Sequence, residues 1–243
     1  SDRTRRIFEP GAAPVEKRIE TLRAFKEAGC AVGILAMPLL PGITDDEASV
    51  AALFDIAADI GVDFIQPGGL TLRPGRQKDH YLDVLSDEWE RLLPLYQLLY
   101  RESRPSGAPI RAHQEELVGR CLAHSRQAGL PFLVPHRVYR DQLEAYDEAA
   151  VLIRHMIELY QAAGVDTSAL RTAAHRYLER VEERKRDYNR HRSWDYANLA
   201  EEIFAPGALE TTLENDKLSV FLRDAVIARR EFDYVALKLE DPA

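Results

Sequence analysis

The stretch Ala31-Val-Gly-Ile-Leu-Ala-Met-Pro-Leu-Leu-Pro-Gly42-Ile-Thr-Asp45 decides the fold class of this chain. Its apolar run, residues 32–37, does not alternate with polar residues, which is typical of a parallel strand covered on both faces. The strand is predicted to end there, because Pro38, Pro41 and Gly42 do not continue a strand. The stretch therefore predicts a buried strand whose carboxyl end meets a turn.

Helices and strands alternate around this stretch. Thr44 or Asp45 can cap a helix predicted over residues 46–60, and residues 62–66 predict a second strand. Another helix is predicted before the first strand, over residues 15–28. This alternation is typical of a parallel α/β architecture, in which ligands bind at the carboxyl ends of the strands.

Two segments lie at the predicted strand ends, residues 37–42 and residues 66–73. Gly68 and Gly69 in the second segment would let a ligand approach the backbone closely. The alternative interpretation is that both segments are ordinary turns between a strand and a helix.

Short motifs follow one another in a fixed order between residues 7 and 100. They are Phe8-Glu-Pro-Gly-Ala-Ala-Pro14, Glu16-Lys-Arg-Ile-Glu-Thr-Leu22, Glu27-Ala-Gly29, Met37-Pro-Leu-Leu-Pro-Gly-Ile-Thr-Asp45 and Gly69-Leu-Thr-Leu-Arg73. This order resembles the later barrel half of radical S-adenosylmethionine proteins, and it is most similar to the spore photoproduct lyase-like group, also labelled DNA repair photolyases. Beyond Arg101 the resemblance rests on Pro135-His-Arg137 and a helical tail.

The resemblance implies a helix-rich α/β fold: the carboxyl-terminal half of a partial TIM-type (βα)6 barrel, followed by a mostly α-helical domain. It also implies a parent enzyme that binds S-adenosylmethionine at the barrel rim, cleaves it at a 4Fe-4S cluster and starts lyase-type radical chemistry. The implied cofactor-binding residues are Met37, Pro38, Gln66, Gly68, Gly69, Thr71 and Arg73. The catalytic residues stay unknown.

The resemblance also implies which segment would contact which part of the cofactor. The strand end at Met37 and Pro38 would pass near the ribose or the methionyl group, and residues 66–70 would border the adenine and the substrate. Thr71 and Arg73, polar residues at a strand end, could orient a carboxylate or a phosphate.

The hallmark of that superfamily is a Cys-x-x-x-Cys-x-x-Cys loop, and this chain departs from it. Its two cysteines, Cys30 and Cys121, are scattered, and two scattered thiolates do not hold an iron-sulfur cluster in the usual way. We therefore expect no metal ligand here and a chain that begins partway through a longer protein. The cluster and S-adenosylmethionine are expected for the parent protein, and this chain alone is expected to be inactive.

Two parallel strands by themselves leave an open sheet edge and an uncovered apolar face. We expect the missing amino-terminal barrel half to cover them, or else a second chain, or the carboxyl-terminal helices folding back. The rival function is a non-enzymatic helical protein-interaction module whose barrel remnant serves as a docking platform for a partner.

Length and composition are those of an ordinary globular protein, with 243 residues, 46% hydrophobic and 30% charged. The net charge of −8 does not favour a nucleic-acid partner, although the basic segments 73–78, 101–111 and 180–192 leave one open. The last segment and its neighbour Trp194 include aromatic residues that could stack on bases. No apolar run is long enough for a membrane span, and two cysteines without a disulfide pattern favour the cytoplasm.

The Pro/Gly/Ser-rich segment 103–109 marks the predicted division of the chain. We predict a barrel half over residues 1–102, a linker or loop over residues 103–111 and a helical domain over residues 112–243. In that domain the pattern predicts an extended segment at residues 130–135 and helices over residues 112–128, 140–163, 168–190, 194–204 and 209–230.

Several common enzyme motifs are absent. No His-Glu-x-x-His pattern, phosphate-binding glycine loop or Gly-x-Ser-x-Gly elbow occurs in the sequence. His136 stands out among the histidines, because it follows an extended apolar segment and its side chain could enter a pocket. The alternative is a histidine satisfied by a backbone carbonyl. Tyr81 could likewise reach the barrel rim or serve packing alone.

Overall fold

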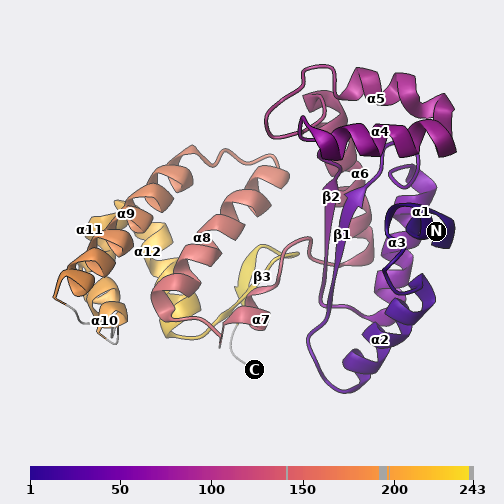
Figure 1. Cartoon of the computed structure of the whole chain (residues 1–243). Coiled ribbons are helices and arrows are strands. Elements are labelled where there is room, and N and C mark those ends of the chain that lie inside the picture. Colours follow the sequence, from indigo (N-terminus) through magenta and orange to yellow (C-terminus); the bar gives the residue numbers. More distant parts are fainter. Residues whose placement is uncertain (141, 192–195, 197, 241–243) are drawn as a thin grey trace. The chain divides into compact units, whose positions relative to one another are not determined.

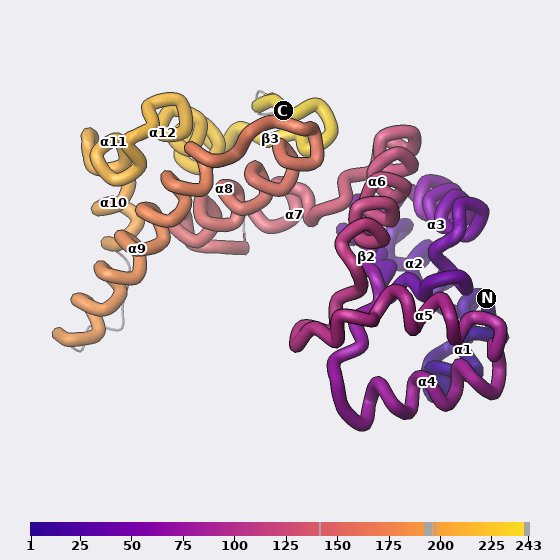
Figure 2. Tube along the Cα trace, turned by 90° about the horizontal axis from the view of Figure 1, so that it is seen from above, coloured from indigo at the N-terminus to yellow at the C-terminus, as the bar shows by residue number. Residues whose placement is uncertain are grey.

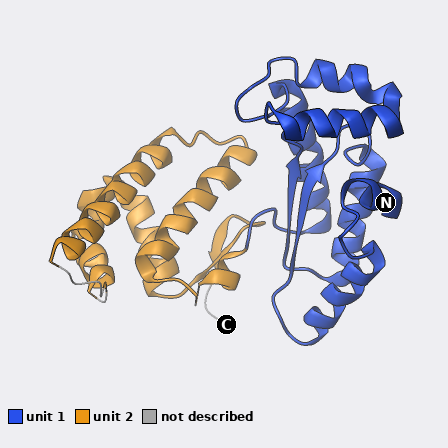
Figure 3. Cartoon of the chain, in the orientation of Figure 1, with its two compact units in different colours: residues 1–134 blue, residues 135–243 orange. Residues whose placement is uncertain are grey.

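The computed structural model describes residues 1–140, 142–191, 196 and 198–240. The chain divides into two compact units, Ser1–Val134 and Pro135–Ala243 (Figure 3). It is 62% helical and 8% strand, so the predicted helix-rich α/β class is confirmed. The described residues show no barrel.

The first unit alternates helices with two strands (Figure 1). Its elements are α1 (Asp2–Phe8), α2 (Val15–Glu27), β1 (Gly33–Leu39), α3 (Glu47–Ile60), β2 (Phe64–Gly69), α4 (Arg76–Trp89), η1 (Glu90–Leu92), α5 (Leu93–Leu99) and α6 (Arg111–Ala128). The predicted order of helix, strand, helix and strand therefore holds from α2 to β2.

Strands β1 and β2 form a two-stranded parallel sheet. Leu35 pairs with Gln66 in this register, and the register shifts between Ala36 and Leu39. Strand β1 continues through Pro38 beyond its predicted end at Met37. The proline is tolerated because it lies within the register shift, where the ladder does not require its missing N–H.

Local capping fixes α3. The side chain of Asp46 accepts a hydrogen bond from the amide of Ser49 at the helix start, so the expectation that Thr44 or Asp45 is the cap is wrong. Thr44 and Asp45 instead bond to the loop before the helix. Gly61 ends α3 with a φ of 71°, a left-handed conformation that glycine adopts without steric cost.

One face of the sheet carries the main core of the first unit. Helices α3 and α6 pack against each other and α6 packs on β2, and both helices lie on the same side of the strands (Figure 2). Helix α2 adds Ile19 and Leu22 at the margin of the same core. The buried members of this core are Val32, Leu39, Val50, Phe54, Ala57, Ile60, Val62, Ile65, Leu117, Cys121 and Leu130.

A second core covers the carboxyl ends of the strands. It is formed by Leu40, Leu70, Leu72, Leu85, Tyr96, Leu99 and Tyr100, with Phe8 and Trp89 packed at its margin. The segment predicted to be a linker or loop folds onto it, because the amide of Leu72 donates to the carbonyl of Gly107 at 2.7 Å. Residues 103–109 are thus an ordered loop within the first unit.

The chain divides after Val134, whereas the sequence predicted a division at residues 103–111. Helix α6 carries Leu117 and Cys121 into the core beneath β1 and β2, so it belongs to the first unit. The amide of Ile65 also donates to the carbonyl of Pro131 at 2.9 Å, which attaches the predicted extended segment to β2.

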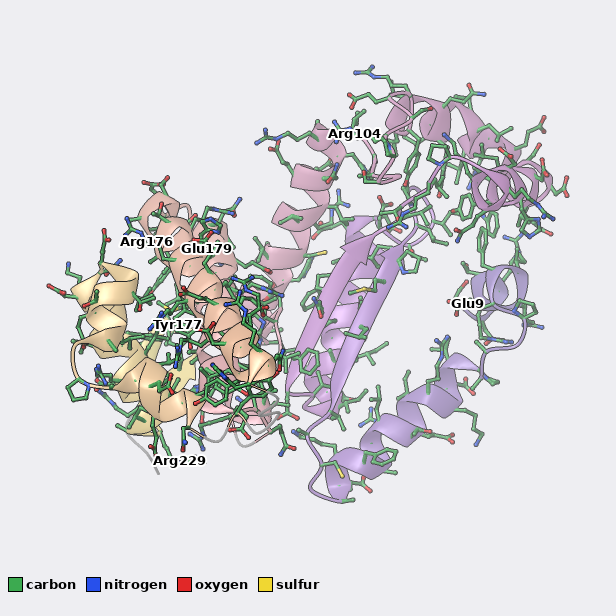
Figure 4. The ribbon with its side chains drawn as sticks, turned by 60° about the vertical axis from the view of Figure 1, so that its left-hand side comes forward. Glu9, Arg104, Arg176, Tyr177, Glu179 and Arg229 are labelled. Carbon is green, nitrogen blue, oxygen red and sulfur yellow. The ribbon has the colours of Figure 1, made fainter. Side chains whose placement is uncertain are left out.

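The second unit is mostly helical. Its elements are α7 (His136–Tyr139), α8 (Ala145–Ala162), α9 (Ser168–Arg190), α10 (Leu199–Phe204), α11 (Ala208–Leu213), α12 (Asp216–Leu222), the π-type turn η2 (Arg223–Ile227), β3 (Glu231–Asp233) and β4 (Lys238–Glu240). Tyr177 on α9 is fully buried and its hydroxyl donates to the carbonyl of Tyr146 on α8 at 2.9 Å (Figure 4). This bond and the apolar face of α8 join the two long helices.

The end of the chain departs from the sequence prediction. The single helix expected over residues 209–230 is divided, because Glu214 adopts a φ of 46° and Asn215 caps a new helix. After η2 the chain forms an antiparallel hairpin of β3 and β4, which the sequence did not predict. Trp194, where another helix was predicted to start, lies outside the described residues, and α10 begins at Leu199.

Within the described residues, none of the helices has the length and apolar character needed to cross a membrane.

Candidate functional site

The two faces of the β1–β2 sheet differ in their surroundings. Ile34, Ala36 and Ile65 point into the core, so the alternate residues of both strands lie on the opposite face. We call that side the open sheet face; it consists of Gly33, Leu35 and Met37 from β1 and Phe64, Gln66 and Gly68 from β2. Leu35 is 63% exposed and Met37 is 47% exposed. The expectation of a strand covered on both faces is therefore wrong, whereas the expected uncovered apolar face is present.

Two glycines shape the open sheet face. A Cβ atom on Gly33 would overlap the ring of Phe64, and one on Gly68 would lie 3.0 Å from the Cβ atom of Met37. The large side chain of one strand therefore lies across a glycine of the other strand at both ends of this face. Between them, Leu35 pairs with Gln66, whose amide is the polar side chain of this face.

The seven residues predicted to bind a cofactor lie at different places in the structure. Met37, Gln66 and Gly68 lie together on the open sheet face. Gly69 is on the other side, because a Cβ atom there would come within 3.2 Å of Leu117 on α6. Pro38 is exposed at the register shift of β1.

The other two predicted residues, Thr71 and Arg73, are exposed beyond the end of β2 and lie outside the sheet. Between them and the strand, Leu70 is buried in the second core, and the hydroxyl of Tyr100 donates to its carbonyl at 2.9 Å. Because Leu40, Leu70 and Leu72 close the carboxyl ends of the strands, Leu70 does not present its side chain to a ligand. Of the seven predicted residues, Met37, Gln66 and Gly68 thus share the open sheet face, whereas Pro38, Thr71 and Arg73 are exposed outside it.

Polar groups hold the loop between β1 and α3 in place. The Oγ1 atom of Thr44 accepts a hydrogen bond from the amide of Leu40 at 2.8 Å. The buried carboxylate of Asp45 accepts another from the amide of Gly42 at 2.7 Å. These two bonds turn the chain sharply from the strand into the helix.

Helix α6 adds a row of polar side chains to this loop. His113 lies 3.5 Å from the carboxylate of Asp45, and His124 lies 2.7 Å from that of Glu47. Arg120 donates to the carbonyl of Asp45 and pairs with Glu47 at 3.3 Å. This arrangement was not predicted, although the helical spacing of His113, Arg120 and His124 indicates a shared face.

The two thiols do not fit an iron-sulfur cluster. Cys30 is exposed and precedes β1, at the end of the sheet opposite the predicted ligand rim. Cys121 is buried in the core, and burial raises its pKa to about 11, which disfavours the thiolate that ligates iron. Among the described residues, no group of three or more His, Cys, Asp or Glu is arranged to hold a metal ion.

Tyr81 belongs to an aromatic cluster in the second core. Its ring stacks on Phe8 with centroids 5.0 Å apart, and its hydroxyl lies 2.9 Å from that of Tyr96. Burial raises the pKa of Tyr81 to about 12. These contacts support the packing interpretation of Tyr81, since its hydroxyl already has a partner inside the core.

The basic segments contain paired and unpaired cations. Arg104 pairs with Glu102 at 2.5 Å (Figure 4), whereas the exposed Arg73 has no ion pair among the described residues. On α9, Arg180 pairs with Glu183 at 3.0 Å, as expected for a solvated helix. Tyr188 of the same segment packs on Tyr196 and donates to Glu202 at 2.9 Å, which is the packing alternative for this aromatic residue. Trp194 lies outside the described residues, so base stacking by it stays a prediction.

His136 is buried in the second unit, where both of its ring nitrogens have partners. Nε2 lies 2.8 Å from the carboxylate of Glu148, and Nδ1 accepts a hydrogen bond from the amide of Phe232 at 3.1 Å. The expected partner, a backbone carbonyl, is therefore wrong. Because neither nitrogen is free, His136 does not offer a general base.

Comparison of the chain with protein-family models, with curated proteins and with solved structures finds no match.

Proposed function

We propose that this chain is the closing portion of a radical S-adenosylmethionine enzyme of the spore photoproduct lyase-like kind. In this proposal it supplies cofactor- and substrate-binding surface, and another part of the parent protein supplies the cluster ligands. The open sheet face carries the proposal. Helices cover one side of a parallel βα unit while large apolar side chains remain exposed on the other, which is the two-sided pattern of a barrel wall.

The residues of the open sheet face suit part of S-adenosylmethionine. Leu35 and Met37 offer apolar contact for the flat adenine or for the methionyl chain, and the Gln66 amide can both donate to and accept from a ring edge. When bound in the parent enzyme, the cofactor supplies the adenosyl group for radical chemistry. The residues of this chain bind and orient it and exclude water from this face.

The same structure does not suit the 4Fe-4S cluster. Cys30 and Cys121 lie in different environments, and the Cys121 thiol is held in its protonated form. The proposal therefore derives no step through the cluster and requires its ligands to come from elsewhere in the parent protein.

The two methionines of the chain provide a direct test of whether the open sheet face is covered. Met37 is 47% exposed on this face, whereas Met156 is 6% exposed and serves as an internal control. With hydrogen peroxide, mass spectrometry should show rapid oxidation of Met37 and slow oxidation of Met156 in the chain alone. Co-expression with the polypeptide encoded directly upstream should protect Met37 and leave Met156 unchanged. Equal oxidation of Met37 in both samples would contradict the proposal.

Cofactor binding is tested in the assembled protein. Gln66→Ala should weaken S-adenosylmethionine binding about threefold to tenfold, the loss expected for one hydrogen bond to an uncharged group. Gln127→Ala, an exposed glutamine on α6, is the matched control and should leave affinity unchanged. Equilibrium dialysis with labelled cofactor measures both.

The rival function, a non-enzymatic helical interaction module, is favoured by the same unsuitable thiols, since they give the chain no cluster of its own. It predicts that a protein partner protects Met37 while S-adenosylmethionine has no effect on either methionine. It also predicts no Cys-x-x-x-Cys-x-x-Cys loop in the reading frame upstream, so sequencing that frame distinguishes the two functions.

A further inference from the structure

The carboxyl-terminal hairpin, Glu231–Glu240, is attached to the second unit through a buried histidine. The amide of Phe232 donates to Nδ1 of His136 at 3.1 Å. A backbone amide can only donate, so Nδ1 carries no proton and the imidazole proton is on Nε2. Nε2 then donates to Glu148 on α8 at 2.8 Å. His136 and Phe232 are 0% and 1% exposed, so water does not substitute for either bond.

A second contact of the hairpin behaves differently. The hydroxyl of Tyr234 lies 2.7 Å from Nδ1 of His155 and 2.6 Å from the hydroxyl of Tyr139. Hydroxyl groups both donate and accept, so this chain of bonds can reverse its direction if His155 gains a proton. The bond from Phe232 to His136 has no such freedom, because its donor is an amide.

We infer that His136 acts as a proton-sensitive pin for the hairpin. In the neutral imidazole, Nδ1 is the acceptor that the Phe232 amide requires. A proton added to Nδ1 places one donor against another in a buried site, and the hairpin then detaches as the pH falls. The packing of Phe232 and Tyr234 against α7 and α8 would then depend on pH.

Other charged and titratable groups near His136 are distributed over three elements. Helix α7 contributes Tyr139 and Arg137, α8 contributes Glu148, Arg154 and His155, and the hairpin contributes Glu231 and Tyr234. Arg137 and Glu231 pair at 3.6 Å in a partly exposed position. Burial raises the pKa of Tyr139 and of Tyr234, so both phenols stay neutral over the relevant range.

His155 is the competing acid-sensitive group. Burial, with smaller contributions from Arg154 and His136, lowers its pKa to about 4 from a usual value of 6.5. The unfolded chain therefore binds this proton more tightly, and the contribution of His155 to stability is complete above pH 6.5 and decreases as the pH falls toward 4. Substitution of His136 alone separates the two histidines.

Hydrogen exchange of residues 229–240 in the full chain, corrected for intrinsic rates, measures detachment. As the pH is lowered in steps, protection of the Phe232 amide should fall by about tenfold or more in the natural chain. His136→Gln keeps one acceptor and one donor in the side chain but does not titrate, so its protection should fall only by the part that His155 causes, and by less than in the natural chain. His175→Gln, on the exposed face of α9, is the matched control and should behave like the natural chain. An equal fall in His136→Gln and in the natural chain would overturn the inference.

A second measurement covers the case in which His136→Gln does not hold the hairpin at neutral pH. Ring ¹⁵N spectra of the natural chain report the protonation of His136 directly. The proton should be on Nε2 at neutral pH, and loss of Phe232 protection should follow the titration of His136. Protonated Nδ1 at neutral pH, or detachment that follows His155 instead, would refute the pin.

Discussion

The open sheet face of the first unit and the hairpin site of the second depart in opposite ways from the usual distribution of polar and apolar groups. Leu35 and Met37 are large apolar residues left 63% and 47% exposed, whereas His136 and Glu148 are polar residues left 0% and 3% exposed. Isolated exposed apolar residues are common, but two on one strand form a patch that another surface can cover. Buried polar groups persist only with partners, and here each has one. The first region is therefore a surface that a partner can cover, whereas the polar groups of the second already have hydrogen-bond partners within the chain.

The largest expected effect is on the hairpin side of this comparison. Phe232→Ala removes a ring that is 1% exposed and packs edge to face on Phe221 with centroids 5.0 Å apart. We expect a loss of about 3–5 kcal/mol in the free energy of unfolding of the second unit. Leu35→Ala, on the open sheet face, should cost less than about 1 kcal/mol in the chain alone. Urea unfolding followed by circular dichroism checks both, and similar losses would remove the contrast between the two sites.

A smaller effect is expected from Glu148→Ala. The substitution leaves the Nε2 proton of His136 without its acceptor in a buried site, which costs about 1–3 kcal/mol. Glu158→Ala is the matched control, because Glu158 is exposed on the same helix. Hydrogen exchange across residues 135–240 localises the loss. A change no larger than that of the control would show that the His136–Glu148 bond does not contribute measurably to the stability of the second unit.

The third expected effect is a dependence of stability on pH. Because the pKa of His155 is lowered to about 4, the second unit should be most stable above pH 6.5 and lose stability steadily as the pH falls toward 4. His155→Gln should flatten this part of the profile, while the open sheet face, which carries no titratable side chain, should contribute nothing to it. Thermal unfolding at a series of pH values tests this expectation, and an unchanged slope in His155→Gln would contradict it.

The sequence predicted the parts of the fold that local signals specify. Helix α3 was predicted close to its observed bounds, because cap-forming residues precede it and Gly61 ends it, although the cap proved to be Asp46 and not Thr44 or Asp45. Helix α9 was predicted at its observed bounds from the cap-forming residues before it and from the acids and bases that alternate along it. The apolar run of β1 correctly indicated a strand, but periodicity did not reveal that one face would be exposed.

The hairpin was missed because its turns lack the usual residues. Arg229, just before β3, and Leu237, in the turn before β4, adopt φ values of 58° and 55°, in a region where glycine is the expected residue. Strands β3 and β4 are also too short to show alternation. Of the residues that the resemblance implies for cofactor binding, Met37, Gln66 and Gly68 share the open sheet face and Gly69 does not, because the side of the sheet that each residue faces depends on the register.

Gly33 and Gly68, which lie opposite Phe64 and Met37, influence the shape of the open sheet face. The side chains of Phe64 and Met37 lie so close to Gly33 and Gly68 that neither position takes a larger residue unless these side chains move. A methyl group at position 68 would push the side chain of Met37 away from the backbone of β2. The shape of the open sheet face at both of its ends therefore depends on glycine at positions 33 and 68.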